Sequence, residues 1–255
     1  MHNGILRKTL LKLRQLNFGD INVKRGKKMD TKKILSYLSD LENNNTREWY
    51  HAHKTEYQEA NAEFESLIAE LMMNIGVTDS SILNNNPKKL TFKLVRDMRF
   101  SNDKSPYNPS FRAHISSGGK LLVPVGYYIS IRPGNRTFVG GGLFASVFKD
   151  ATTMIRDYIV THGAEFQQII SDKSFKDNFT VMGEALKNVP KGYDKEHPQA
   201  EYLKNKSWYL EYHMPDVLVA NAEQFITEAT EKYVLMQPFN AFLNKALDGF
   251  KMPTR

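Results

Sequence analysis

The chain has 255 residues, of which 41% are hydrophobic and 25% are charged. This composition is typical of globular proteins, and the chain is long enough to bury a sizeable core. It contains no cysteine, which excludes disulfides, thiolate metal sites and cysteine nucleophiles. The missing cysteine also favours a reducing compartment, so we expect a cytoplasmic protein.

The net charge of +7 is not spread over the chain. Residues 1–28 carry eight Lys and Arg residues and one Asp, which leaves 27 basic and 27 acidic residues from Met29 onward. The body of the protein is therefore neutral and has no general attraction for phosphate backbones. We expect no nucleic-acid partner.

The basic leader, residues 1–28, has three interpretations. It is a basic amphipathic helix on a membrane surface, a targeting segment, or a disordered or non-native extension translated from an early start codon, with Met29 as the native start. Lys12 and Arg14 interrupt its apolar run and argue against a signal peptide. No later run reaches the roughly 18 apolar residues of a membrane span, so we expect no membrane partner and a single domain over residues 29–255.

Two helices are predicted at the start of this domain. Residues 31–41 show a helical apolar period, and Asp30 stands at the position of an N-cap. Asn45, with Glu48 three residues later, predicts the cap of a longer helix. The buried stripe of that helix is Tyr50, Tyr57, Phe64 and Leu71.

The period changes to two after the loop at 84–89, which predicts strands. The segments are 90–97, 110–116, 123–133 and 136–141, with a fifth candidate at 207–214. Short Gly-containing separators favour an antiparallel meander. Helical periodicity returns from 147 to about 180, and a helix over 221–248 ends the chain. The prediction is an α+β fold of four to five strands, with helices packed on one face and long helices near both ends.

A charged loop lies between the first two predicted strands, in the segment RDMRFSNDKSPYNPSF from Arg96 to Phe111. Alternation places Arg96 on a mostly apolar face, where a guanidinium needs a partner such as Asp97 or Asp103. The loop charges are interpreted as structural ion pairs, as part of an anion site, or as a docking surface. The residues alone leave these alternatives open.

A polar face is predicted on the neighbouring strands. Alternation places Arg112 and His114 on one side of their strand, and Tyr128 and Ser130 on the matching side of the next. A guanidinium fork suits a carboxylate or phosphate, and the hydroxyl and imidazole groups add hydrogen bonds. This combination favours an anionic ligand.

Other motifs give little signal. His51 and His53 point about 200° apart on a helix and cannot share a metal ion. The glycines of GGGLF at 140–144 lack the spacing of a nucleotide-binding loop and are better explained by close backbone packing. Asp194 and His197 have the side chains of a general base and its orienting partner, but turn and capping roles explain them better. We expect no metal and no cofactor.

The segment RDMRFSNDKSPYNPSFRAHIS resembles the domain of unknown function 2461 family, a widespread and mostly bacterial family. The matching positions are Arg96, Asp97, Arg99, Phe100, Ser101, Asp103, Lys104, Ser105, Pro106 and Tyr107. Further similarity is found in NNNTREWYHAHKTEY, in GYYISIRPGNRTFVGGGLF with its pair Gly141 and Gly142, and in PKGYDKEHP followed by LKNKSW. The resemblance covers residues 31–250, departs from the family pattern at Asn108, and implies a cytoplasmic α+β protein without an established activity.

Two functions are consistent with these residues. The first is binding of a small phosphate- or carboxylate-bearing ligand at a basic, aromatic-edged site on the sheet; whether a reaction follows is not predicted. The alternative is a non-catalytic protein-interaction module whose charged loop is an ion-pair network built on Asp97 and Asp103. The candidate ligand-binding residues are Arg96, Arg99, Lys104, Tyr107, Arg112, His114 and Tyr128.

Overall fold

A four-stranded antiparallel sheet with the order β1-β2-β3-β4 forms the centre of the fold. The computed structural model describes residues 29–97, 99, 102–144, 146 and 148–253, so the predictions for residues 1–28 lie outside it. The strands are β1 (Phe111–Ile115), β2 (Gly126–Ile131), β3 (Thr137–Leu143) and β4 (Trp208–Met214).

The predicted meander accounts for β1, β2 and β3. The turn between β2 and β3 contains Gly134 at φ 81° and Asn135 at φ 59°, and both residue types tolerate this left-handed backbone. The fourth strand arrives after a long helical excursion and pairs with β3, from Thr137 opposite Met214 to Leu143 opposite Trp208. The predicted α+β class is confirmed.

Two long helices, α4 and α11, cover one face of the sheet. Asn221 starts α11 by accepting a hydrogen bond from the Gln224 backbone N–H, and the ring of Tyr233 on this helix packs against Tyr127 of β2 at 5.3 Å. The helices are α2 (Thr31–Asn43), α3 (Arg47–Ala52), α4 (Lys54–Gly76), α5 (Pro87–Leu90), α6 (Lys149–Thr161), α7 (Gly163–Ser171), α8 (Lys173–Lys176), α9 (Ala200–Leu203), α10 (Asp216–Val219) and α11 (Ala222–Ala246), with a 3₁₀ turn at Ser80–Ile82.

Two local predictions are wrong. Residues 90–97 form only isolated bridges, Thr91 to Ala113 and Val95 to Tyr107, instead of a strand. The residue that caps α3 is Thr46, not the predicted Asn45, and its side chain accepts a hydrogen bond from the Trp49 N–H. The predicted single long helix is interrupted at His53 and continues as α4. Asn45 is therefore free to bond elsewhere.

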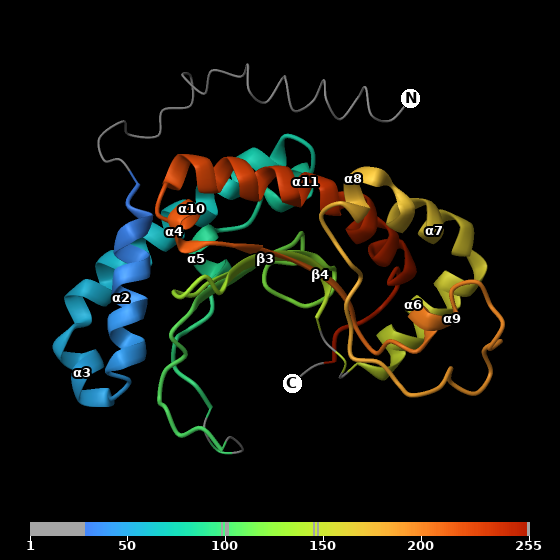
Figure 1. The fold of residues 1–255 in the computed structure, drawn as a ribbon, viewed down its shortest axis with the longest axis horizontal. Coiled ribbons are helices and arrows are strands. Elements are labelled where there is room, and N and C mark those ends of the chain that lie inside the picture. The colour runs from blue at the N-terminus through green and yellow to red at the C-terminus, as the bar shows by residue number, and fades with distance from the viewer. Residues whose placement is uncertain (1–28, 98, 100–101, 145, 147, 254–255) are drawn as a thin grey trace.

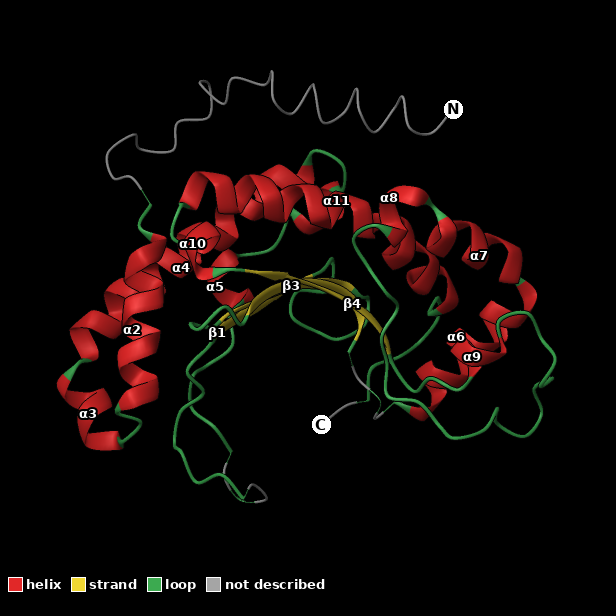
Figure 2. Cartoon of the chain, in the orientation of Figure 1, coloured by secondary structure: helices red, strands yellow, loops and turns green. Residues whose placement is uncertain are grey.

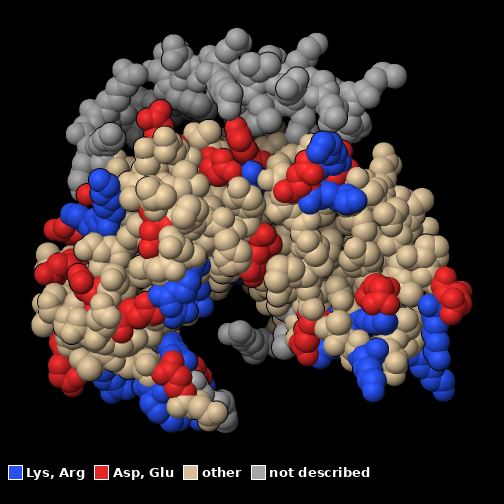
Figure 3. Space-filling view, in the orientation of Figure 1, with Lys and Arg blue, Asp and Glu red and all other residues tan. Residues whose placement is uncertain are grey.

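The helices leave the other face of the sheet uncovered at its centre. Figures 1 and 2 show α11 along the upper face, α2 and α3 on the left, and α6, α7 and α9 on the right. Figure 3 shows a hollow between these two sides, directly beneath the sheet. Among the helices that the structure describes, none has the length and apolar character needed to cross a membrane.

Candidate functional site on the open face of the sheet

The surface of the sheet opposite α11 is called the open face, and it is built by strict alternation. Gly141 packs against Met236 and Asn240 of α11, so its neighbour Gly140 must face the other way. Residues that are directly paired across strands lie on the same face of the sheet. Gly140 pairs with Tyr128 on β2 and with Glu211 on β4, so these two residues face the same way as Gly140. The open face consists of Arg112, His114, Tyr128, Ser130, Phe138, Gly140, Tyr209, Glu211 and His213.

Aromatic rings form a continuous row over this face. Phe144 lies over Gly140, where an added Cβ would come within 2.9 Å of the ring. Ring centroids are 5.1 Å apart for Phe144 and Tyr128, and 4.6 Å apart for Phe144 and Tyr209. Phe92 and Phe138 contact Tyr128 from either side, at 6.4 and 5.8 Å. The row offers a flat apolar surface of the kind that stacks against a planar group.

Arg112 stands at the β1 end of this row, half-buried. Its guanidinium lies 5.7 Å from the centre of the Phe92 ring and donates to the Lys93 carbonyl oxygen at 3.4 Å. Its Nε atom is buried and has no hydrogen-bond partner among the described residues. No carboxylate of the described chain lies within ion-pair distance of it. A planar donor fork is thus left with unused donors.

Tyr128 is coupled to this guanidinium. Burial raises the pKa of its hydroxyl, while the charge of Arg112 and a hydrogen bond from Arg112 act in the opposite direction. The hydroxyl therefore stays protonated at neutral pH and presents a hydrogen-bond donor next to a cation.

The β4 end of the open face has the opposite charge. Glu211 is partly buried, with 19% of its side chain exposed, and its Oε2 atom lies 3.3 Å from Nε2 of the exposed His213. Three strand spacings separate β1 from β4, or about 14 Å. The open face is therefore polarised, with Arg112 at one end and Glu211 at the other.

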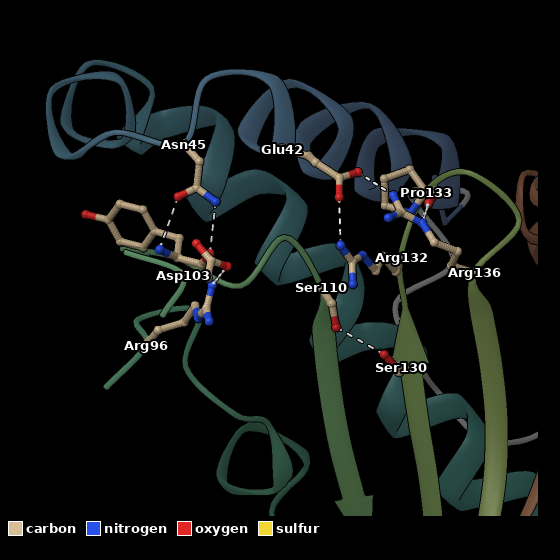
Figure 4. A network of polar contacts seen from close by, with 10 residues as sticks. Glu42, Asn45, Arg96, Asp103, Ser110, Ser130, Arg132, Pro133 and Arg136 are labelled. Carbon is tan, nitrogen blue, oxygen red and sulfur yellow. Dashed lines mark hydrogen bonds and ion pairs between the residues drawn. The ribbon is translucent and has the colours of Figure 1, made fainter. Parts of the chain in front are cut away.

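His114 and Ser130 share the open face but are buried. His114 is 3% exposed, and burial lowers its pKa to about 4, with the backbone of Leu121 and Lys120 partly offsetting this effect. Ser130 is 6% exposed, and its hydroxyl lies 3.0 Å from that of Ser110 (Figure 4). The prediction that His114 contacts a ligand is not retained, because no ligand reaches a side chain this buried without rearrangement.

The charged loop forms its own ion pairs. Asp103 binds the guanidinium of Arg96 (Figure 4), and Asp97 binds that of Arg99 at 2.5 Å. Hydrogen bonds from Ser105 and from Arg96 hold the pKa of Asp103 well below its usual range. The structure thus gives Arg96 and Arg99 carboxylate partners within the loop, in keeping with the ion-pair interpretation. Lys104 is an exposed residue of the same loop.

Tyr107 points away from solvent. It is 5% exposed, and its ring stacks on Tyr50 at 4.2 Å. Its backbone N–H donates to Asn45 and its carbonyl accepts from the same side chain. Tyr107 therefore fixes the loop to the helices, and its predicted role in ligand contact is not retained.

Four residues on or beside the open face were not among the predicted site residues: Phe92, Phe144, Tyr209 and Glu211. Phe92 lies in the predicted strand 90–97 and Phe144 follows the predicted strand 136–141. Tyr209 and Glu211 lie on β4, whose partner strand was not predicted. Pairing 207–214 antiparallel to 136–141 would have placed Tyr209 and Glu211 beside the predicted polar face. Within the described part of the chain, no group of three or more His, Asp or Glu side chains is arranged to hold a metal ion.

Comparison with known proteins gives one match. The model of the family described as "Conserved hypothetical protein (DUF2461)" matches residues 33–242. The chain belongs to this family. Neither the curated proteins nor the solved structures contain a significant match to the chain. Membership of the DUF2461 family carries no assigned activity.

Proposed function

We propose that this DUF2461 protein binds a small organic anion on the open face of the sheet, with Arg112 as the anchor. The observation that carries the proposal is the half-buried guanidinium of Arg112, which no carboxylate of the described chain neutralises and whose Nε lacks a partner. A half-buried charge is stabilised by a counter-ion. A ligand carboxylate or phosphate would supply it and would also accept a hydrogen bond from the Tyr128 hydroxyl.

Nearby positive charge supports the same ligand class. Lys120 Nζ lies 5.7 Å from the Phe92 ring centre and donates to the Thr91 carbonyl oxygen at 3.3 Å. Lys93 is exposed, and its carbonyl accepts from Arg112. The Arg112 guanidinium and the Lys120 ammonium thus lie at the same end of the aromatic row, which raises the local concentration of anions.

The rest of the face restricts the ligand further. The aromatic row suits a planar or apolar body next to the anionic group. Glu211 would repel a second anionic group at the far end and would accept a hydrogen bond from a neutral or cationic one. The favoured ligand is therefore a molecule of up to about 14 Å with an acidic group at one end only. We place the protein in the cytoplasm on the basis of its lack of cysteine.

The test is a thermal-shift screen of the protein against phosphate, nucleotides, sugar phosphates and aromatic carboxylates, followed by calorimetric titration of each hit. A ligand at about 100 times its Kd adds roughly 2.7 kcal/mol to the free energy of unfolding. For a chain of this size the melting temperature should rise by about 5–10 °C.

Two variants and a matched control assign a hit to the open face. Arg112→Gln should weaken binding by at least about tenfold, since it removes a charge-assisted hydrogen bond, and Tyr128→Phe should weaken it less. Arg99→Gln removes one positive charge from the ion-paired loop and should leave the affinity unchanged. Equal loss in Arg112→Gln and Arg99→Gln would reduce the effect to net charge, and a screen without hits would favour a protein-interaction module.

A further inference from the structure

The carboxylate of Glu211 is a second charge on the open face that lacks a charged partner. Among the described residues, the one basic side chain within ion-pair distance is that of His213, whose Nε2 atom lies 3.3 Å from Glu211 Oε2. A neutral imidazole donates a hydrogen bond at most, so it leaves the negative charge uncompensated. Only 19% of the Glu211 side chain is exposed, and a carboxylate with this little exposure is stabilised by a positive charge.

The sheet register fixes the distance between Glu211 and the anion-binding end of the open face. Tyr128 and Glu211 both pair with Gly140, so they lie directly across the sheet from each other with β3 between them. Two strand spacings separate them, or about 10 Å. The guanidinium of Arg112 interacts with the Tyr128 hydroxyl. An acidic group held by Arg112 and Tyr128 would therefore lie about 10 Å from the Glu211 carboxylate.

Aromatic rings occupy the space between these two ends. Phe144 lies over Gly140, and Tyr209 stacks on Phe144 with ring centroids 4.6 Å apart. Burial raises the pKa of the Tyr209 hydroxyl, and the negative charge of Glu211 raises it further. Glu211 therefore lies close to the Tyr209 ring, whose face attracts cations. The β4 end of the open face thus combines a carboxylate with an aromatic surface, as cation-binding sites commonly do.

We infer that the anion bound at Arg112 is a zwitterion, whose protonated amine or guanidinium group lies about 10 Å from its acidic group. This inference rests on the proposed function and specifies its ligand class. The acidic group would bind Arg112 and Tyr128, and the body of the molecule would lie along Phe144. The cationic group would lie against Tyr209 and donate to Glu211.

The charges and their separation exclude other ligand classes. A simple anion would neutralise Arg112 and leave Glu211 uncompensated, and a di-acid would bring a second negative charge toward Glu211. A zwitterion whose two groups share one carbon atom, like the α-amino and α-carboxyl groups of an amino acid, is too short to reach both ends. The ligand class is therefore one with an acid and a base at opposite ends of an aromatic or apolar body.

Two ligands that differ in one group test the inference. 4-(3-Aminopropyl)benzoate carries a carboxylate and an ammonium group at about the required separation, and 4-butylbenzoate has a methyl group in place of the ammonium. In calorimetric titrations of the full chain at pH 8 and constant ionic strength, the aminopropyl compound should bind at least about fivefold more tightly. Burial of apolar surface alone predicts the opposite order, since the methyl group is the more hydrophobic of the two.

Variants assign the preference to its two ends. Glu211→Gln should weaken binding of the aminopropyl compound at least about fivefold and should not weaken binding of 4-butylbenzoate. Arg112→Gln should weaken binding of both compounds. Glu196→Gln removes an exposed negative charge outside any described ion pair and should leave both affinities unchanged. The preference itself is measured in the wild type, so the test does not depend on the folding of any variant.

Three outcomes would overturn the inference. One is equal or tighter binding of 4-butylbenzoate by the wild type. The second is a preference for the aminopropyl compound that survives in Glu211→Gln. The third is the absence of saturable binding of the aminopropyl compound up to about 10 mM, a range that detects a Kd of about 1 mM. Binding of 4-butylbenzoate that is lost in Arg112→Gln would still support the anion site, whereas failure of the whole anion screen would overturn the proposed function as well.

Discussion

The carboxamide of Asn45 makes two hydrogen bonds to the backbone of Tyr107, which lies 62 residues later in the chain. Asn45 Nδ2 donates to the Tyr107 carbonyl at 2.9 Å, and the Tyr107 N–H donates to Asn45 Oδ1 at 3.1 Å. One side chain thus imitates the backbone pairing of a strand and closes the C-terminal end of the charged loop onto the helices.

Asn45→Ala should therefore destabilise the protein. Two partly buried backbone groups lose their partners, which we expect to lower the free energy of unfolding by about 2–4 kcal/mol. Urea unfolding at pH 7 measures the change. Asn44→Ala is the control, since the side chain of this exposed neighbour bonds only to the Asp40 carbonyl within its own helix. Equal losses in both variants would show that the Tyr107 contact is unimportant.

His114 should make stability depend on pH. Burial lowers its pKa from the ordinary 6.5 to about 4 in the folded protein. The unfolded chain therefore binds a proton that the folded protein does not, and stability is lost as the pH falls from about 6.5 to 4. The loss should be about 2 kcal/mol at pH 5. Urea unfolding at pH 7 and pH 5 tests this.

The variant His114→Gln isolates that effect. Its stability at pH 7 will differ from that of the wild type, but the difference between pH 7 and pH 5 should shrink by about 2 kcal/mol. The His213→Gln variant is the control, because His213 is exposed on the same face of the sheet. A pH dependence that survives in His114→Gln would assign it to other groups.

Gly142 should be intolerant of substitution. Its φ is 92°, and an added Cβ would lie 2.4 Å from the Trp208 carbonyl oxygen and 2.9 Å from the Tyr209 Cα. Gly192 has a similar φ of 99° with open space around it. Gly192→Ala should cost only the backbone strain of about 1–2 kcal/mol. Gly142→Ala should cost at least about 1–3 kcal/mol more, measured by thermal or urea unfolding.

Glu42 should contribute a small, acid-sensitive part of the stability. Its carboxylate binds both Arg136 and Arg132 (Figure 4), and these contacts lower its pKa. The contribution is present above the ordinary value of 4.5 and is lost as the pH falls through the lowered folded value. All three side chains are partly exposed, so the effect should be at most about 1 kcal/mol.

Glu42→Gln should flatten the stability profile below pH 4.5, as followed by unfolding at pH 7 and about pH 3. Asp248→Asn, an exposed change outside any described ion pair, should leave the profile as in the wild type. A profile unchanged by Glu42→Gln would mean that the two arginines are equally well solvated without it.

Local patterns in the sequence predicted the elements whose contacts are local. The hairpin of β2 and β3 follows from its alternation and its Pro-Gly-Asn turn, and Asp30 caps α2 by accepting from Lys32 and Lys33. Alternation also placed Arg112, His114, Tyr128 and Ser130 on one face of two adjacent strands, which the observed register confirms. These features depend on residues that are close in sequence or that lie on two strands joined by a short connection.

Features that depend on distant partners were not predictable in this way. Asn45 has the spacing of a helix cap, but its bonds to Tyr107 come from a loop 62 residues away. Residues 90–97 alternate like a strand, yet they meet β1 only at one bridge and otherwise follow the charged loop. His114 has the chemistry of a ligand contact, but its burial comes from tertiary packing.

The isolated bridges flanking the sheet also determine how other chains can approach it. Phe92 N–H donates to the Arg112 carbonyl on the β1 side, and Met182 and Tyr209 exchange two hydrogen bonds on the β4 side. Unpaired edges invite strand addition and aggregation. Here the outer strands are each partly paired by a short non-strand segment, so β-augmentation would require one of these segments to detach. A peptide partner would bind through side chains more readily than through a fifth strand.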